Sequence, residues 1–408
     1  MVVCGLMVKD PIDKLLDDAA SGKSLFKSRE VLHFAYMPEL VLHRDDEQKK
    51  VTQSLIPLLK RARPSNLLIY GKPGTGKTLV VKKVLGKIQE RVKDGSFPIQ
   101  LLYANAKEET TLYGLLVKFG RQLGLTSQKE LPTTGLSISE VFNRLMNVIE
   151  KNNLNTVFVV DEIDYLAELV SKTGKDVFYS LTRANERLKK GSLTLIGISN
   201  DLTFKERLDP RVLSSLSEEE IVFTNYTVDQ IKEILLERIK EAFIPNVLEA
   251  AALNLCAAMS GQEHGDARRA IDLLRVAGEI AEREQSDMIK EDHIRKASLK
   301  MEEDKETTAL NSYPLHEKLL ILAVMKANGN TTGEIYQSYK NLCKVTRQKE
   351  LTQRRVTQML SEIEMTGLIS GKIVHQGMHG RTKKFALTLN PETVKKAFKE
   401  DLALEDLL

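Results

Sequence analysis

Short runs of apolar residues alternate with helical segments between residues 66 and about 223. Four of these runs are predicted to be strands, at 66–70, 100–104, 156–160 and 193–197. Because a strand that is apolar at consecutive positions is buried on both faces, such strands separated by helices predict a parallel sheet covered by helices. Residues 1 to about 60 predict a polar, helical lead-in with an extended break at 36–39.

The pattern becomes wholly helical after about residue 226. Apolar residues recur there at helical spacing, at Ile231, Ile234, Leu235 and Ile239. Two further helical segments follow, at 247–259 and 267–284. Acidic residues and lysines at 301–308 then predict a solvated helix or a linker.

The last block of the chain, from about residue 311, predicts three helices and then two strands joined by a Gly-rich turn. Their ranges are 315–327, 332–344, 351–365, 368–374 and 382–389. This order is typical of a winged helix, which is a helix-turn-helix with an appended hairpin. We therefore expect three domains: an α/β domain at 1–224, a helical domain at 225–305 and a winged helix at 306–408.

Composition narrows the class of protein. With 408 residues, of which 42% are hydrophobic and 28% charged, the chain is expected to be an ordinary soluble globular protein. Three widely spaced cysteines argue against a disulfide framework, and the apolar runs are far shorter than the roughly 20 residues of a membrane span. His375 and His379 predict a solvated loop rather than a metal site. We expect a cytoplasmic protein.

A glycine-rich motif directly follows the first predicted strand. The sequence GKPGTGKT at 71–78 matches the P-loop pattern, and a helix is expected to begin at about Lys77. Its glycines let backbone N–H groups turn toward phosphates. We expect Lys77 to reach the β- and γ-phosphates and Thr78 to ligate Mg²⁺. The predicted nucleotide-binding residues here are Gly71, Lys72, Pro73, Gly74, Thr75, Gly76, Lys77, Thr78 and Leu79.

Polar residues end the third and fourth predicted strands, at the sheet edge where ligands bind in open α/β folds. Asp161 is expected to hold Mg²⁺ and the nucleotide with Thr78, and Glu162 to polarise the attacking water as general base. The alternative, that these acids only cap the next helix, is disfavoured by the P-loop upstream. Asp164 is expected first to be an N-cap. Asn200 is expected to sense the γ-phosphate and its water.

Two further segments contain candidate arginines. Arg211 or Arg207 is expected to be an arginine finger that reaches a neighbouring subunit's γ-phosphate, and a structural salt bridge is the alternative for both. Arg268 follows the turn and N-cap residues Gly265 and Asp266, so we expect it to point back to the nucleotide. Together with the strand-end residues and the P-loop, these elements predict an AAA+ ATPase with a helical lid.

Positive charge is concentrated in the predicted winged helix. Residues 340–384 include ten basic and three acidic residues, although the formal net charge of the whole chain is +4. The helix at 351–365 turns basic residues outward on its N-terminal half, where a recognition helix meets the major groove. The predicted DNA-binding residues are Lys349, Arg354, Arg355, Gln358, His379, Arg381 and Lys383. The alternative is a winged helix that contacts protein.

With these motifs in this order, the chain resembles the archaeal replication-initiator family, which is related to the origin recognition complex and to the cell-division-cycle helicase-loading ATPase. The resemblance covers nearly the whole chain. It rests on YMPELVLHR at 36–44, NDLTFKERLDPRVLSSL at 200–216, GDARRAIDLL at 265–274 and LTQRRV at 351–356. The second of these segments is specific to that family.

The resemblance implies that ATP or ADP binds with Mg²⁺, with Leu42 and Arg44 beside the adenine. It implies that an insertion at about 108–134 forms a helical clasp that touches DNA, where Lys118 and Arg121 are the first candidates. It also implies that the winged helix binds double-stranded origin DNA. The implied protein partners are the replicative helicase and paralogous initiators on DNA.

We therefore expect a nucleoid-associated AAA+ ATPase that binds origin DNA and helps to initiate replication by recruiting or loading the replicative helicase. Hydrolysis is expected to be weak and to serve as a switch. The alternative is a nucleotide-switched transcription regulator, because the same residues serve both functions. A clamp loader fits less well, since such proteins end in an oligomerisation collar without a basic wing.

Overall fold

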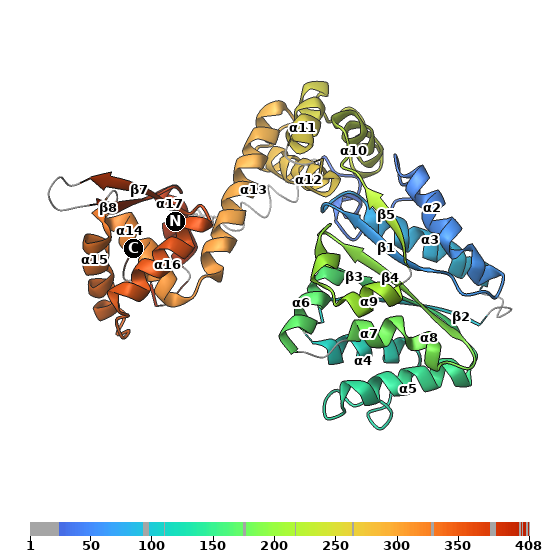
Figure 1. Ribbon diagram of the computed structural model, residues 1–408. Coiled ribbons are helices and arrows are strands. Elements are labelled where there is room, and N and C mark those ends of the chain that lie inside the picture. Colours follow the sequence, from blue (N-terminus) through green and yellow to red (C-terminus); the bar gives the residue numbers. More distant parts are fainter. Residues whose placement is uncertain are drawn as a thin grey trace, which may run out of the picture. The chain divides into compact units, whose positions relative to one another are not determined.

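The structure is a computed structural model (Figure 1). It describes residues 24–92, 98–109, 111–173, 177–216, 218–262, 265–327, 330–375, 381–399, 401, 403, 404 and 407. Contacts divide the chain into two compact units, Met1–Ile294 and Arg295–Leu408. Within the described part of the chain, no helix combines the length and the apolar character needed to cross a membrane.

The first unit is built on a parallel five-stranded sheet. Its strands are β1 (Asn66–Gly71), β2 (Ile99–Asn105), β3 (Asn155–Asp161), β4 (Ser192–Ser199) and β5 (Glu218–Phe223). They lie in the order β2-β3-β4-β1-β5, and all neighbouring pairs are parallel. The four predicted strands and the parallel sheet are therefore confirmed. The strand β5 was not predicted; it begins with three glutamates and lies at an edge of the sheet, where charged residues are tolerated.

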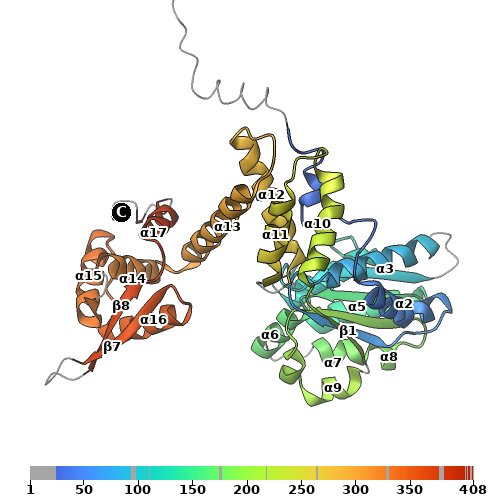
Figure 2. The same cartoon turned by 90° about the horizontal axis from the view of Figure 1, so that it is seen from above.

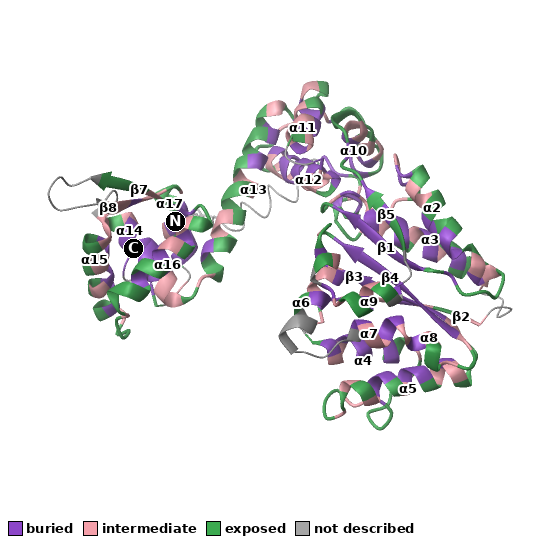
Figure 3. Ribbon diagram, viewed as in Figure 1, coloured by how far each residue is buried: buried purple, intermediate pink, exposed green. Residues whose placement is uncertain are grey.

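Helices cover both faces of this sheet, as the buried residues of β1 show. Leu67 and Ile69 belong to the core under α2 (Asp45–Leu59) and α3 (Lys77–Val92). Leu68 and Tyr70 belong to the core on the other face. The strands β1, β3 and β4 are buried along almost their whole length (Figure 3). The helices α4 to α9 of this second layer are Leu112–Gln122, Ile138–Lys151, Ile163–Thr173, Val177–Thr182, Ala184–Arg187 and Pro210–Leu216, with the 3-10 helix η2 at Phe204–Arg207.

A helical lid follows β5. It consists of α10 (Val228–Ala242), α11 (Ala250–Gln262), α12 (Ala267–Arg283) and the start of α13 (Glu291–Ser312). A Thr227 capping box begins α10, so the chain becomes helical directly after the sheet. The whole of 301–308 lies in α13, which confirms the helix rather than the linker.

The segment 24–44 is mostly irregular, apart from the 3-10 helix η1 (Glu30–Leu32), so the expected helical lead-in is wrong for these residues. Its backbone binds the end of α10 instead: the Lys27 and Ser28 N–H groups both donate to the carbonyl of Ala242. Phe26 stacks on Phe243 with ring centroids 4.7 Å apart. These contacts attach the segment to the lid (Figure 2). Among residues 24–60, α2 fulfils the helical prediction.

The second unit is a winged helix. Its elements after α13 are α14 (Leu315–Lys326), β6 (Asn330–Thr331), α15 (Thr332–Val345), α16 (Gln353–Met365), β7 (Ile369–His375), β8 (Arg381–Leu387) and α17 (Pro391–Phe398). The antiparallel sheet has the order β6-β8-β7. The three predicted helices and the hairpin are confirmed. Neither β6 nor the short α17 was predicted, and α17 buries Val394 and Phe398 in the core of this unit.

Candidate functional site

The P-loop lies between β1 and α3, and Lys77 is the first residue of α3. The Lys77 ammonium is buried and donates to the carbonyls of Gly71 at 2.7 Å and Lys72 at 2.8 Å. It also donates to Asn200 Oδ1 at 2.9 Å, although 123 residues separate the two in sequence. Burial lowers the pKa of Lys77 to about 8, because a desolvated ammonium is disfavoured. The strand order thus brings the predicted phosphate-binding lysine and the predicted sensor together.

The two predicted magnesium ligands also lie together. Asp161 is buried at the carboxyl end of β3, and its Oδ2 accepts a hydrogen bond from the Thr78 hydroxyl at 2.8 Å. A carboxylate and a hydroxyl beside a P-loop are the kind of oxygen ligands that Mg²⁺ takes, so the donor set fits this ion. Glu162 follows with a positive φ of 53°, which is uncommon for a non-glycine residue and recurs at functional sites.

A tyrosine that the sequence analysis missed completes this group. Tyr103 lies on β2, next to β3, and its hydroxyl donates to Asp161 Oδ2 at 2.7 Å. Burial is the first cause that raises the pKa of Tyr103, and the neighbouring Asp161 charge adds to it. The signal available in the sequence was its place near the end of a predicted strand, whereas the pairing of that strand with the acidic strand is seen in the structure.

Asp164 accepts hydrogen bonds from the Ser199 hydroxyl at 2.9 Å and from the Asn200 N–H at 3.4 Å. It lies inside the first turn of α6 rather than before it, so its prediction as an N-cap is wrong. Its role is to fix the end of β4, where Asn200 follows.

Arg44 lies beside the P-loop but is bound by the protein itself. Its guanidinium is buried, with Nε donating to the Thr75 carbonyl at 2.9 Å and Nη2 to the Thr224 carbonyl at 2.5 Å. It also lies 3.9 Å from the centre of the Tyr226 ring. Arg44 therefore connects the P-loop to the junction between sheet and lid. Leu42 is half-buried nearby in sequence.

The start of lid helix α12 meets the P-loop. Asp266 is the N-cap of α12, and its side chain accepts from the N–H groups of Arg268 at 2.9 Å and Arg269 at 3.1 Å. The Ala267 N–H donates to the Gly74 carbonyl at 3.3 Å. Arg268 is exposed, and its charge contributes to lowering the pKa of Lys77 after burial. The predicted lid arginine thus lies close enough to Lys77 of the P-loop for the two charges to interact.

Of the two arginine-finger candidates, Arg211 makes the salt bridge that was the alternative. Its Nε and Nη2 lie 3.0 and 2.9 Å from the two oxygens of Asp209, while the side chain is 77% exposed. Hydrogen bonds from Arg211 hold the pKa of Asp209 at about 2. Arg207 ends η2, and its side chain lies outside the described residues.

The recognition helix α16 turns its basic residues outward. Val356, Met359, Leu360 and Ile363 form its buried face. Arg354, Arg355 and Gln358 are exposed, as is Lys349 before the helix. Glu362 ties two of the predicted DNA contacts together: Gln358 donates to it at 2.8 Å, and Arg355 lies 3.6 Å from it. Among the described residues, no ion pair holds Arg354.

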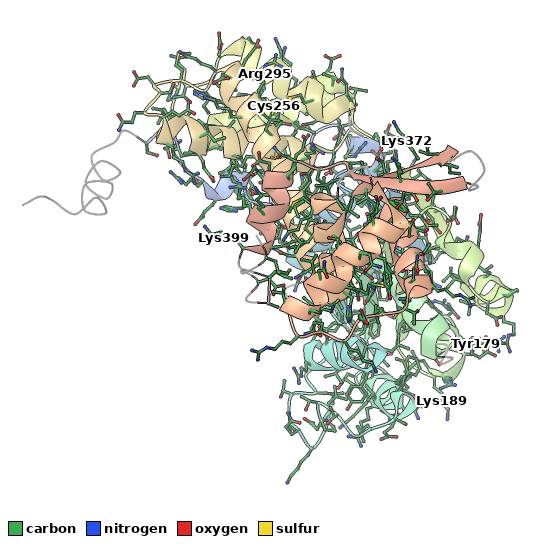
Figure 4. The ribbon with its side chains drawn as sticks, turned by 90° about the vertical axis from the view of Figure 1, so that its left-hand side faces the viewer. Tyr179, Lys189, Cys256, Arg295, Lys372 and Lys399 are labelled. Carbon is green, nitrogen blue, oxygen red and sulfur yellow. The ribbon has the colours of Figure 1, made fainter. Side chains whose placement is uncertain are left out.

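The wing separates its lysines onto two faces. Lys383 pairs with Glu364 of α16, and its ammonium lies 5.3 Å from the centre of the Phe385 ring. This pairing turns Lys383 toward its own domain. Lys372 and Lys384 are opposite each other in the register of β7 and β8, and Lys372 is exposed (Figure 4). Of the two wing-tip predictions, His379 and the side chain of Arg381 lie outside the described residues.

The expected insertion at 108–134 comprises α4 and the loop that follows it. Leu115, Leu116 and Phe119 of α4 are buried in the core of the first unit. Lys118 lies 3.2 Å from both Glu108 and Glu109, and Arg121 is exposed. DNA contact by Lys118 and Arg121 stays a prediction.

Three family models match successive parts of the chain. Residues 60–204 match an AAA domain, residues 232–299 the Cdc6 AAA+ ATPase-type lid domain, and residues 308–397 the CDC6 C-terminal winged helix domain. The exact domain boundaries stay a prediction.

Full-length similarities agree with these matches. The ORC1-type DNA replication protein of Cenarchaeum symbiosum is 67% identical over 400 residues, which covers 98% of this chain and 97% of that protein. That of Pyrococcus abyssi is 42% identical over 402 residues, covering 97% and 95%. The Aeropyrum pernix ORC1 protein, solved in complex with DNA, has a TM-score of 0.81 at 38% identity and covers 94% of this chain and 99% of that one.

The order of the elements, the convergence of Lys77, Asn200, Thr78 and Asp161, and the winged helix are what an AAA+ initiator requires. The sequence identity to these ORC1-type proteins extends over almost the full length of this chain and of each relative. The chain therefore belongs to the family of ORC1-type DNA replication proteins, which are replication initiators built on an AAA+ ATPase.

Proposed function

We propose that this initiator binds ATP or ADP with Mg²⁺ at the P-loop, beside the start of α12. The observation that carries the proposal is the 2.9 Å contact between Lys77 and Asn200. The three oxygens that Lys77 meets are uncharged, so a phosphate supplies the anion that a buried ammonium favours. Backbone N–H groups of the P-loop and the following Leu79 complete the cradle.

We assign the magnesium ion to Thr78 and Asp161, because both present oxygen at one point beside the P-loop. When bound there, the ion neutralises charge on the β- and γ-phosphates. Arg268 is assigned to the γ-phosphate side, and Leu42 to the adenine. Arg44 supports the nucleotide indirectly, because its guanidinium is already bound to the P-loop and lid junction.

Hydrolysis is proposed to be weak and to act as a switch. Glu162 orients the attacking water as general base, and Asn200 holds that water against the γ-phosphate. Arg211 serves as the finger of a neighbouring copy, since its side chain is exposed and forms a local ion pair with Asp209. A single copy lacks this contribution, so its turnover is slow.

The winged helix is proposed to bind double-stranded origin DNA. Exposed Arg354 on the N-terminal half of α16 and the excess of basic over acidic residues in 340–384 support this. The similarity to a protein solved in complex with DNA supports it further. Recruitment or loading of the replicative helicase, and assembly with paralogous initiators, are proposed from family membership.

The test of the nucleotide site compares Lys77→Ala with Lys87→Ala, a change at an exposed position of the same helix. Binding of a fluorescent ADP analogue is measured by anisotropy, and folding by circular dichroism. Lys77→Ala is expected to abolish nucleotide binding with the fold intact and much of the DNA binding retained, while Lys87→Ala binds normally. Normal binding by Lys77→Ala would refute the site.

A further inference from the structure

The carboxylate of Asp161 is held from three directions. Its Oδ2 accepts hydrogen bonds from Tyr103 at 2.7 Å and Thr78 at 2.8 Å. Its Oδ1 accepts from the Glu162 N–H at 3.0 Å. Of these donors, Thr78 is the one that shares the ion with Asp161, so the tyrosine hydroxyl remains to orient the carboxylate when the ion binds.

Tyr103 itself lies on β2, an edge strand, where no further strand of the described residues holds the backbone. The side-chain amide of Gln122 takes that place. Its Oε1 accepts from the Tyr103 N–H at 3.0 Å, and its Nε2 donates to the Tyr103 carbonyl at 2.9 Å. Gln122 is the last residue of α4, which packs on the sheet face opposite the Tyr103 ring, so both backbone groups of Tyr103 are fixed by a rigid element.

The ring of Tyr103 is fixed as well. The ammonium of Lys82, on α3, lies 4.3 Å from the ring centroid, within the range of a cation–π contact. Contacts from α3 and β3 to its side chain, and from α4 to its backbone, therefore meet at one residue that no P-loop or acidic motif includes.

We propose that Tyr103 is a positioning residue for the magnesium ligand Asp161, and that Gln122 holds Tyr103 in the position from which it does so. This inference rests on the proposed nucleotide site. Ligating carboxylates are themselves hydrogen-bonded, and loss of such an outer partner typically weakens metal affinity by about 10- to 100-fold. Tyr103 is not a catalytic residue in this account, because it acts through Asp161.

The experiment uses the full chain and separates metal binding from nucleotide binding. Mn²⁺, which takes the same oxygen ligands as Mg²⁺, is titrated into protein saturated with a non-hydrolysable ATP analogue, and free Mn²⁺ is read by electron paramagnetic resonance. Affinity for a fluorescent ADP analogue is measured separately in EDTA. Tyr103→Phe removes only the hydroxyl. Tyr113→Phe is the matched control, because its hydroxyl donates to the Pro132 carbonyl at 2.6 Å, away from Asp161.

Tyr103→Phe is expected to weaken Mn²⁺ binding by about 10-fold while nucleotide binding in EDTA is unchanged. Gln122→Ala keeps the Tyr103 hydroxyl but removes the side chain that holds the Tyr103 backbone, and it is expected to weaken Mn²⁺ binding by a few-fold. Tyr113→Phe is expected to leave Mn²⁺ binding unchanged. The role of Tyr103 would be overturned if Tyr103→Phe bound Mn²⁺ with wild-type affinity. It would also be overturned if this variant lost as much affinity for the ADP analogue in EDTA as it lost for Mn²⁺. An unchanged Gln122→Ala would overturn that of Gln122. Failure of the wild type to bind nucleotide would instead refute the proposed site.

Discussion

The carboxylate of Asp266, at the start of the lid helix, lies directly against Gly74 of the P-loop. A Cβ built on Gly74 would be 1.7 Å from Asp266 Oδ1, and Gly74 has a φ of +73°, which side-chain-bearing residues rarely adopt. The glycine is therefore required twice, once for its backbone conformation and once because the lid approaches so closely. The lid and the phosphate loop are fitted to each other through these two residues.

Gly74→Ala is expected to weaken nucleotide binding by at least about 10-fold, because the methyl group displaces the lid and strains the loop. The control is Gly86→Ala on α3, where the added carbon meets nothing within 4 Å. That change is expected to stabilise the fold by about 0.5–1 kcal/mol and to leave binding intact. Equal nucleotide affinities in calorimetry for both variants would contradict the close fit.

The lowered pKa of Lys77 predicts a pH effect on stability. Its folded-state pKa is about 8 and the ordinary value is 10.5, so the unfolded chain binds more protons between these pH values. The free energy of unfolding contributed by Lys77 therefore rises from pH 8 to pH 10.5. Relative to Lys77→Met, the nucleotide-free wild type is expected to gain up to about 3 kcal/mol over this window. The free energies of unfolding are measured in urea. If the difference between the wild type and Lys77→Met does not change with pH over this window, the burial of this charge is contradicted.

Glu362 is expected to restrain DNA binding, because it occupies Arg355 and Gln358 and places a negative charge on the outer face of α16. Glu362→Gln is expected to tighten DNA binding several-fold and to steepen its salt dependence. Glu392→Gln, an exposed acidic residue on α17, is the control and should change little. Weaker binding by Glu362→Gln in anisotropy titrations would mean that Glu362 positions Arg355 usefully.

Substitutions of Lys383 and Lys372, which lie on opposite faces of the wing, are expected to affect stability and DNA binding separately. Lys383→Ala breaks the pair with Glu364 and is expected to destabilise the winged helix by about 1 kcal/mol. Lys372→Ala removes an exposed charge on the same hairpin, so it should weaken DNA binding with little change in melting temperature. Thermal melts and DNA titrations measure the two effects. A destabilised Lys372→Ala together with weaker DNA binding by a stable Lys383→Ala would contradict this placement of the two lysines.

The sequence predicted those parts of the fold and site whose signal is local. Four buried strands, the P-loop, the strand-end acids and the helix-hairpin order are each visible in a few consecutive residues. The edge strand β5 was not predicted because its three glutamates interrupt the apolar pattern. A strand with one neighbouring strand tolerates such charged residues. Tyr103 and the binding of Arg44 to the lid junction escaped because they depend on which distant segments the topology brings together.

The nucleotide-bound chain is proposed to read origin DNA through its winged helix. The most direct measurement is a salt-titrated binding assay with ADP or ATP, comparing the organism's own origin-proximal DNA with scrambled DNA. The account predicts a specificity ratio of about 10³ or more that is lost when Arg354 and Arg355 become alanine. Equal affinity for both DNAs, with the same salt slope, would contradict it.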